Sequence, residues 1–308
     1  MHRLFTLILL MSSPALADAP RVATDIAPVH SLVSQVMDGV GTPDLIIPPA
    51  ASPHGYAMRP SEARALSGAD LVVWVGPALT PWMEEPLEAL APNATHLTLM
   101  DADGMTFLPF RGGEAFSVDH SHDHGHGHDH GHVEEHEAAD PHIWLDPMNG
   151  AQMLTAIAHA LAELDPDNAA RYRQNAEAGR AQLAALTAEI DVQLAPAKDR
   201  PFIVFHDAFH YFEARFEIEA KAAVSTGDAA KPGAGRVASL RKQVDKVGVV
   251  CAFAEPQMDT GILATVIENQ STKIAILDPI GVDQPLGPDL YPELLRALAT
   301  GMANCLRP

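Results

Sequence analysis

The sequence predicts an α/β protein in which two lobes, each built on a parallel sheet, are joined by a long rigid linking helix. Three observations lead to this fold class. Short apolar runs alternate with helical patterns over residues 21–100, the same plan returns over residues 201–308, and a long helical region lies between them at residues 149–194. Alternation of this kind is typical of parallel sheets covered by helices. The length of 308 residues fits about two domains, since domains usually have roughly 100–200 residues.

The first lobe is expected to hold four short strands separated by helices. The run LVVWV at residues 71–75 is apolar throughout, as expected of a buried parallel strand. Pro28 and Pro60 suit the first turn of a helix, where the N–H group that proline lacks would have no partner within the helix. We predict strands at residues 21–24, 45–47, 71–75 and 96–100, and helices at residues 28–37, 60–66 and 82–90.

The linking region is predicted to form two helices, at residues 149–164 and 166–194, which are interrupted at Asp165-Pro166. Asp165 suits an N-cap, and Pro166 suits the first position of the second helix. Apolar residues mostly three or four positions apart predict one buried stripe on that helix. At 1.5 Å per residue the second helix would be about 43 Å long, and a stiff helix of this length would limit large hinge closure between the lobes.

The second lobe repeats the pattern of elements without repeating the sequence. Its apolar runs are again short and are separated by helical patterns, which predicts a second parallel sheet. We predict strands at residues 202–205, 217–224, 249–254 and 273–277, and helices at residues 208–215, 236–246, 260–268 and 291–305.

Residues 1–17 have the features of a secretory signal peptide: Arg3, an apolar run at residues 4–11, and the cleavage sequence Ala15-Leu16-Ala17. The alternative is a membrane anchor, but the run is far shorter than the ~20 residues of a spanning helix. No cysteine lies near the cut, so a lipid anchor is not expected. The mature protein should therefore be exported and periplasmic.

The expected domain organisation follows from these segments. Residues 1–17 are the signal peptide, residues 18–148 form the N-terminal lobe, residues 149–196 form the linking helices, and residues 197–308 form the C-terminal lobe. The N-terminal lobe includes a His-rich loop at residues 119–137.

Charge and cysteine content narrow the possible functions. The formal net charge of −20 argues against binding of nucleic acid or of anionic membranes, both of which need a basic face. Export permits oxidation of Cys251 and Cys305. A bridge between them would close a loop of about 55 residues, and the chain-entropy relation predicts that it would stabilise the folded state by about 4 kcal/mol. It would also fasten the last helix to a strand of its own lobe. The alternative role for a cysteine is that of a thiolate metal ligand or nucleophile.

Histidine is unusually abundant, and its distribution points to metal. Of the 16 histidines, eight lie between His120 and His136, where they alternate with glycine, aspartate and serine. The segment has no apolar periodicity, which predicts a flexible loop. Neutral imidazole is a common ligand of zinc, copper and nickel. The alternatives are a solvated spacer or an expression tag, and a tag is not expected in the middle of a chain.

Four residues outside this loop have positions suited to a single metal site. His54 follows the predicted strand at residues 45–47, His142 precedes the linking helices, His206 follows residues 202–205, and Asp278 follows residues 273–277. In open α/β sheets ligands bind beyond the carboxyl ends of the strands. Two ligands from each lobe would place an ion in the cleft between the lobes. Three imidazoles and one carboxylate suit tetrahedral Zn²⁺.

The chain resembles a known family through motifs that occur in a fixed order. These are SPHGYAMRPSEARAL, the His-rich insert, DPHIWLDP, FHDAF and LDPIG, with a late cysteine pair. They are similar to those of the zinc-specific periplasmic substrate-binding proteins of bacterial ABC importers, within the larger family of metal-binding solute receptors. The resemblance covers essentially the whole mature chain. It implies two α/β lobes joined by a rigid helix, with the metal in the cleft between them.

The resemblance also implies a ligand set and partners. It assigns His54, His142 and His206 as zinc ligands, and it places Asp278 where some members have a direct ligand and others a water molecule. Manganese receptors typically have a carboxylate at the position of His206, so an imidazole there favours zinc. Zinc would be the transported ligand, and no substrate would be chemically changed. The expected partners are Zn²⁺, an inner-membrane ABC permease and a periplasmic metallochaperone, with no nucleic acid, and the expected state is a monomer.

Other functions remain as alternatives at this point. A receptor for manganese, nickel or copper would use a similar scaffold. A zinc-dependent hydrolase would use His206 and His210, whose four-residue spacing loosely matches H-E-x-x-H with aspartate for glutamate. A cell-surface adhesin is a third class, which the missing lipid anchor disfavours. We expect Glu255 to line the cleft and His30 and His210 to be structural or auxiliary.

Overall fold

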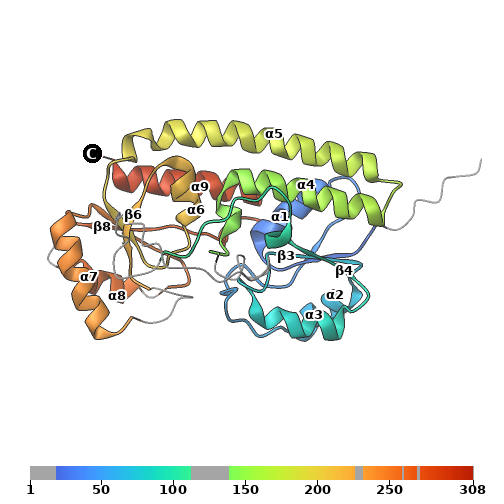
Figure 1. Ribbon diagram of the computed structural model, residues 1–308, viewed down its shortest axis with the longest axis horizontal. Coiled ribbons are helices and arrows are strands. Elements are labelled where there is room, and N and C mark those ends of the chain that lie inside the picture. Colours follow the sequence, from blue (N-terminus) through green and yellow to red (C-terminus); the bar gives the residue numbers. More distant parts are fainter. Residues whose placement is uncertain (1–18, 112–138, 226–231, 259, 269–270, 308) are drawn as a thin grey trace, which may run out of the picture.

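The computed structural model describes residues 19–111, 139–225, 232–258, 260–268 and 271–307. It consists of two α/β lobes beneath a shared layer of helices (Figure 1), so the predicted fold class is confirmed. The predicted signal peptide at residues 1–17 and the His-rich loop at residues 119–137 lie outside the described residues.

The N-terminal lobe is built on a parallel sheet with the strand order β2-β1-β3-β4. The central strand β3 has the sequence LVVW and is buried along its whole length. In Figure 1, α1 lies between this sheet and the helical layer, and α2 and α3 lie on the opposite side. The elements are β1 (Val22–Thr24), α1 (Ala27–Val36), β2 (Asp44–Leu45), α2 (Pro60–Gly68), β3 (Leu71–Trp74), α3 (Glu84–Leu90) and β4 (Thr95–Thr98).

The C-terminal lobe has a second parallel sheet, with the order β6-β5-β7-β8. Side chains of a strand alternate between its two faces. Accordingly Phe202 and Val204 of β5 join the main core, whereas Ile203 packs in a second apolar cluster with α7 and α8. The elements are β5 (Phe202–Val204), α6 (His210–Phe216), β6 (Ala220–Ala223), α7 (Ala234–Val247), β7 (Cys251–Ala254), α8 (Thr260–Val266) and β8 (Lys273–Ile276).

Three long helices form the layer that covers both lobes: α4 (Pro147–Leu164), α5 (Ala169–Leu194) and α9 (Leu290–Leu306). Helix α5 extends from one lobe to the other (Figure 1), and its 26 residues correspond to about 39 Å. One continuous buried cluster includes Leu32 of α1, Leu186 of α5 and Phe202 of β5. The lobes therefore share a core rather than meeting only through a linker.

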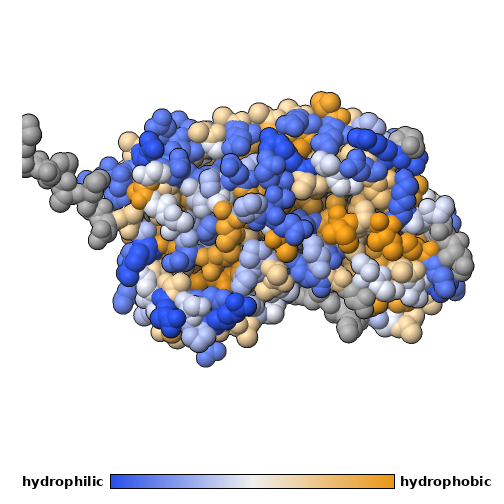
Figure 2. Space-filling model, turned by 180° about the vertical axis from the view of Figure 1, so that it is seen from behind, coloured by the Kyte–Doolittle hydropathy of each residue, from blue (hydrophilic) through white to orange (hydrophobic). Residues whose placement is uncertain are grey.

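The outer face of this layer carries many hydrophilic residues, and apolar residues gather more on the lobes below it (Figure 2). In the part of the chain that the structure describes, no helix combines the length and the apolar character needed to cross a membrane.

The start of α5 differs from the prediction. Asp165 is not its N-cap, because α5 begins at Ala169 and follows Asn168. The Asp165 carboxylate instead accepts a hydrogen bond of 2.8 Å from the Asn168 side chain and one of 2.7 Å from the Tyr172 hydroxyl. These contacts hold a turn between α4 and α5, so Pro166 lies in the turn and not at the first helical position.

Strand β6 is also shorter than predicted. Glu217 ends α6 in a left-handed conformation with φ of 54°, so residue 217 cannot begin a strand. The strand begins only at Ala220.

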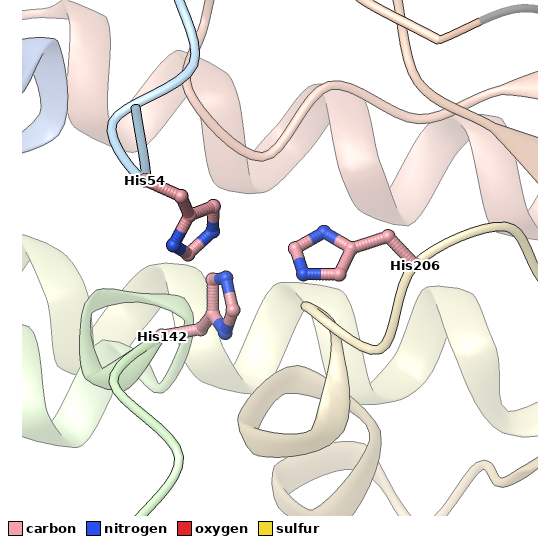
Figure 3. Close-up of side chains that lie close together, drawn as sticks. All are labelled: His54, His142 and His206. Atoms are coloured by element: carbon pink, nitrogen blue, oxygen red, sulfur yellow. The ribbon is translucent and has the colours of Figure 1, made fainter. Parts of the chain in front are cut away.

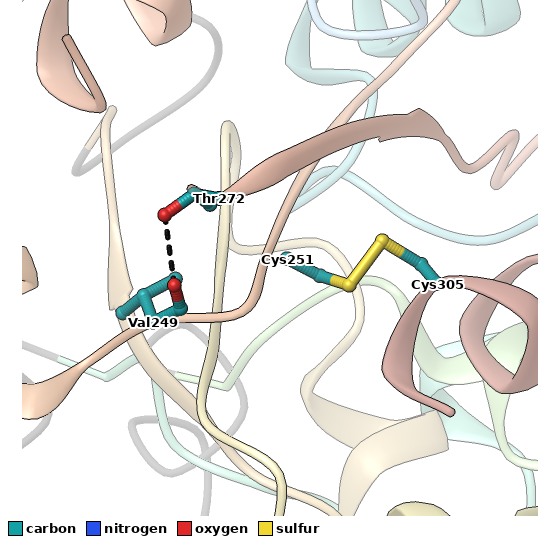
Figure 4. The surroundings of a disulfide bond; sticks show 4 residues. All are labelled: Val249, Cys251, Thr272 and Cys305. Atoms are coloured by element: carbon teal, nitrogen blue, oxygen red, sulfur yellow. Dashed lines mark hydrogen bonds between the residues drawn. A yellow bond between two sulfur atoms is a disulfide. The ribbon is translucent and has the colours of Figure 1, made fainter. Parts of the chain in front are cut away.

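The predicted disulfide is confirmed. Cys251, the first residue of β7, is bonded to Cys305 near the end of α9, with their Cα atoms 6.0 Å apart (Figure 4). The described residues therefore contain no free cysteine, which excludes a thiolate ligand or nucleophile at these positions. The bond fastens α9 to the sheet of the C-terminal lobe.

Candidate metal centre

Three histidines from distant segments meet between the lobes. His54 lies in the loop after β2, His206 is the second residue after β5, and His142 immediately precedes the short 3-10 helix Ile143–Leu145. Their imidazole rings are turned toward one another (Figure 3). One nitrogen of each ring lies within 4.8 Å of the others, and the ring centroids are 4.9 to 5.5 Å apart. The structure therefore brings together the three histidines that the sequence singled out.

The spacing of these nitrogens suits one small ion. In tetrahedral zinc sites the Zn–N bonds are about 2.0–2.1 Å, which places the nitrogens roughly 3.4 Å apart. Small shifts of the rings would bring the three nitrogens to that distance. Three neutral imidazoles are ligands that zinc accepts readily.

The histidines border a small, largely apolar cavity. Its volume is about 30 Å³, and Trp144, Met258 and Ile280 are among its lining residues. His142 and His206 are only 2% and 5% exposed. A space of this size suits a single ion, since pockets for drug-sized molecules are usually ≈ 300–1,000 Å³.

Asp140 orients the His142 ring. Its Oδ1 lies 2.6 Å from His142 Nδ1 and also accepts the His142 backbone N–H at 3.0 Å. Nδ1–H is therefore the donor toward the carboxylate, and Nε2 is the nitrogen with a lone pair for a metal. Burial raises the pKa of Asp140 to about 6, although the His142 backbone N–H and the charges of His210, His206 and Arg111 oppose the rise.

Glu255 faces His206 across the end of the second sheet. Glu255 is 4% exposed, and its Oε1 lies 3.4 Å from His206 Nδ1. Burial disfavours the imidazolium, but the Glu255 carboxylate, helped by Asp140 and Asp207, outweighs it and raises the pKa of His206. Glu255 also lines the cavity, which confirms the expectation that it borders the cleft. Glu255 follows β7, and His206 follows the neighbouring strand β5. The order of the strands reverses between β5 and β7, and such a reversal is the usual place for a ligand site in open α/β sheets.

The segment that carries His142 is attached to the C-terminal lobe. The Tyr211 hydroxyl of α6 donates to the Asp140 carbonyl at 2.8 Å. Arg215, one turn later, pairs with both carboxylate oxygens of Asp146 at 2.8 and 2.7 Å. The Asp146 carboxylate also caps α4 through the backbone N–H of Met148.

Two aromatic residues extend this attachment. The Trp144 indole donates to the Pro279 carbonyl at 2.8 Å, and the Tyr291 hydroxyl donates to the Trp144 carbonyl at 2.6 Å. Hydrogen bonds from α6 and α9 thus hold the His142 segment on one side, and on the other the Asp140 backbone N–H donates to the Leu108 carbonyl at 2.8 Å.

The structure does not bring Asp278 into the histidine group. Its carboxylate accepts backbone N–H groups from the turn that follows β8: Ile280 at 3.0 Å, Gly281 at 2.9 Å and Val282 at 2.5 Å. Among the described residues, the group of possible metal ligands comprises His54, His142 and His206.

Two other histidines have different partners. His30 lies buried in α1, where its Nε2 is 3.2 Å from the Pro43 carbonyl, as expected of a structural residue. His210 begins α6, and its Nδ1 is 3.9 Å from Asp140 Oδ2. His206 precedes that helix, so the two do not share one helix face as in H-E-x-x-H enzymes.

Asp140 is the residue near the site that sequence reasoning missed. The sequence did contain a signal for Asp140, since it is a carboxylate two positions before a ligand histidine. The residues that contact Asp140 from distant parts of the chain, however, could not be inferred from sequence spacing.

Replacing Asp140 with alanine is expected to lower zinc affinity by about 10- to 100-fold, the usual effect of losing a group that orients a metal-binding histidine. Asp140→Asn keeps an oxygen that can accept from Nδ1–H and should lose less. Competitive zinc titration measures both. The exposed Asp191 is a matched control, since Asp191→Ala removes a carboxylate far from the cavity. Equal affinities for Asp140→Ala and the unaltered protein would show that Asp140 has no orienting role.

Comparisons with known proteins show the family to which this chain belongs. The family model "Zinc-uptake complex component A periplasmic" matches residues 22–305. The high-affinity zinc uptake system protein ZnuA of Brucella abortus is 42% identical over 307 residues, covering 92% of this chain and 91% of that protein. The protein of the same name from Paracoccus denitrificans is 42% identical over 305 residues, covering 95% and 94%.

A solved crystal structure of ZnuA is 26% identical and superposes with a TM-score of 0.76, covering 94% of this chain and 99% of that one. Both sequence and fold thus match along nearly the whole chain, and the motifs predicted to bind metal supply the histidines that converge between the lobes. The chain belongs to the ZnuA family, the periplasmic component A of zinc-uptake complexes.

Proposed function

We propose that this protein is a high-affinity periplasmic zinc receptor that delivers Zn²⁺ to the permease of an ABC importer. The observation that carries the proposal is the convergence of three imidazole nitrogens within 4.8 Å of one another. Family membership supports the same function, because the matched family is a component of zinc uptake and not a family of enzymes. Capture would be an exchange of ligands, in which histidines replace water on the ion.

We propose His54, His142 and His206 as the zinc ligands. The fourth ligand is Asp278 or a water molecule, and Asp278 would have to give up its contacts with the backbone turn to reach the ion. The division into a signal peptide (1–17), an N-terminal lobe (18–148), linking helices (149–196) and a C-terminal lobe (197–308) completes the proposal. A monomeric state and a metallochaperone partner are predictions that accompany it.

Metal content after native export tests the proposed function directly. We expect one tightly bound zinc ion, which Mn²⁺ displaces only at large excess. Deleting residues 119–137 should leave that tight site intact and reduce the total number of ions bound. If the deletion abolished tight binding, the tight site would lie in the His-rich segment. If the protein preferred Mn²⁺ to Zn²⁺, zinc would not be its ligand.

Zinc affinity is expected to fall as the pH decreases from 7.5 to 5.5. Protons compete for the same imidazole nitrogens, whose pKa is ordinarily near ~6.5, so each histidine contributes a loss of about tenfold over this range. Because Glu255 raises the pKa of His206, protons should begin to compete there above the usual range. Competitive titration at several pH values measures the effect. An affinity that stays constant over this range would be incompatible with a site built from imidazoles.

A further inference from the structure

The three candidate ligands divide into two groups according to the contacts of the segments that carry them. Hydrogen bonds from Tyr211 of α6 and Tyr291 of α9 fix the segment of His142 beside the C-terminal lobe, which carries His206. The loop of His54 is tied to the N-terminal lobe, where the Trp82 indole donates to the Pro53 carbonyl at 2.8 Å. An ion held by all three histidines must therefore bridge these two groups, and contacts across the boundary should control its escape.

One turn of the C-terminal lobe touches both groups. It follows β7 and is closed by a hydrogen bond of 3.1 Å from the Met258 backbone N–H to the Glu255 carbonyl. At its start, Glu255 faces His206 Nδ1. Two positions later, the Gln257 side-chain amide donates to the carbonyl of Pro49, in the His54 loop, at 3.4 Å. Gln257 also lines the zinc cavity, together with His54.

We propose that Gln257 is a positioning residue that joins the His54 loop to the C-terminal lobe, which carries His206, and so sets how long zinc remains bound. Gln257 supplies no ligand atom in this arrangement. Its amide holds His54 over the ion, and zinc release requires the hydrogen bond to Pro49 to break. This inference rests on the proposed zinc-receptor function and adds a residue that controls the exchange of the ion.

The rate of zinc release tests this role. The full chain is loaded with one equivalent of Zn²⁺ and mixed rapidly with excess chelator, for the unaltered protein and for Gln257→Leu and Gln257→Ala. Leucine keeps much of the side-chain volume but has no N–H donor. We expect release to be roughly three- to tenfold faster in both variants, the effect of losing one neutral hydrogen bond, with the rate of zinc capture nearly unchanged.

Gln193→Ala is the matched control, because the Gln193 amide also joins two elements, donating to Thr300 Oγ1 at 3.2 Å, but far from the cavity. It should not alter release. X-ray absorption should find the same number of imidazoles on zinc in the Gln257 variants as in the unaltered protein.

Unchanged release in Gln257→Leu would overturn the positioning role, as would faster release accompanied by loss of an imidazole from the ion. These outcomes are distinct from failure of the proposed function. If the unaltered protein binds no zinc tightly, the receptor function itself is wrong. If it binds zinc and the variants release it at the same rate, only the role of Gln257 is wrong.

Discussion

Replacing His142 or His206 with alanine lowers zinc affinity by about 100-fold or more. Zinc binding at a four-ligand protein site amounts to about 10–16 kcal/mol, so one ligand accounts for about 3 kcal/mol, which corresponds to roughly 100-fold in affinity. The His54→Ala variant should lose a similar amount. Competitive titration against a chelator of known affinity measures the losses, and the far-UV circular dichroism of each variant should match that of the unaltered protein.

Two further variants sharpen this experiment. His159 is a surface histidine whose side chain is 74% exposed, so His159→Ala should bind zinc normally. Asp278→Asn separates the two possibilities for the fourth ligand: a loss as large as that of the histidine variants assigns Asp278 to the ion, and a loss of only a few fold assigns water. Normal zinc binding by either His142→Ala or His206→Ala would refute the ligand set.

Removing the disulfide, through the paired changes Cys251→Ala and Cys305→Ala, lowers the free energy of unfolding by about 4 kcal/mol. The bond joins residues separated by 54 positions, and a loop of this size accounts for about that much unfolded-chain entropy. Denaturant unfolding of the oxidised protein and of the variant measures the difference. Zinc binding should persist in the folded variant, because Cys251 begins β7 and the site lies beyond the other end of that strand.

Reduction provides the control for this prediction. A thiol reductant should destabilise the unaltered protein by a similar amount and should leave the alanine variant unaffected. If the variant and the oxidised protein unfolded at the same denaturant concentration, the bond would contribute nothing to stability. If reductant also destabilised the variant, its action would not be on this bond.

The sequence was sufficient for the sheets and for the three histidines because both depend on local patterns. Parallel strands appear as short apolar runs, and a histidine just past such a run is placed at the sheet edge by the strand itself. Asp278 satisfies the same rule and yet lies in a turn that accepts three backbone N–H groups. No local pattern distinguishes a carboxylate that faces an ion from one that closes a turn.

The attachment of the His142 segment could not be predicted for a different reason. It depends on Tyr211 and Tyr291, which are 71 and 147 positions away from the carbonyls to which they donate. Contacts of this length arise only after the lobes have packed together. Asp165 shows that contacts over a shorter range are also hard to predict. Its position predicts an N-cap, but its carboxylate accepts a hydrogen bond from the Tyr172 hydroxyl and belongs to the turn before α5.

The small volume of the cavity limits how many water molecules can stay on the zinc ion. A water molecule needs about 10–15 Å³ in such a measure, so a space of about 30 Å³ admits about two waters and not the full shell of an aqueous divalent ion. Zinc must therefore shed most of its water as it enters. Mg²⁺ dehydrates reluctantly and prefers oxygen ligands. The cavity would therefore discriminate against this abundant ion through the free-energy cost of removing its water, without any group that repels it.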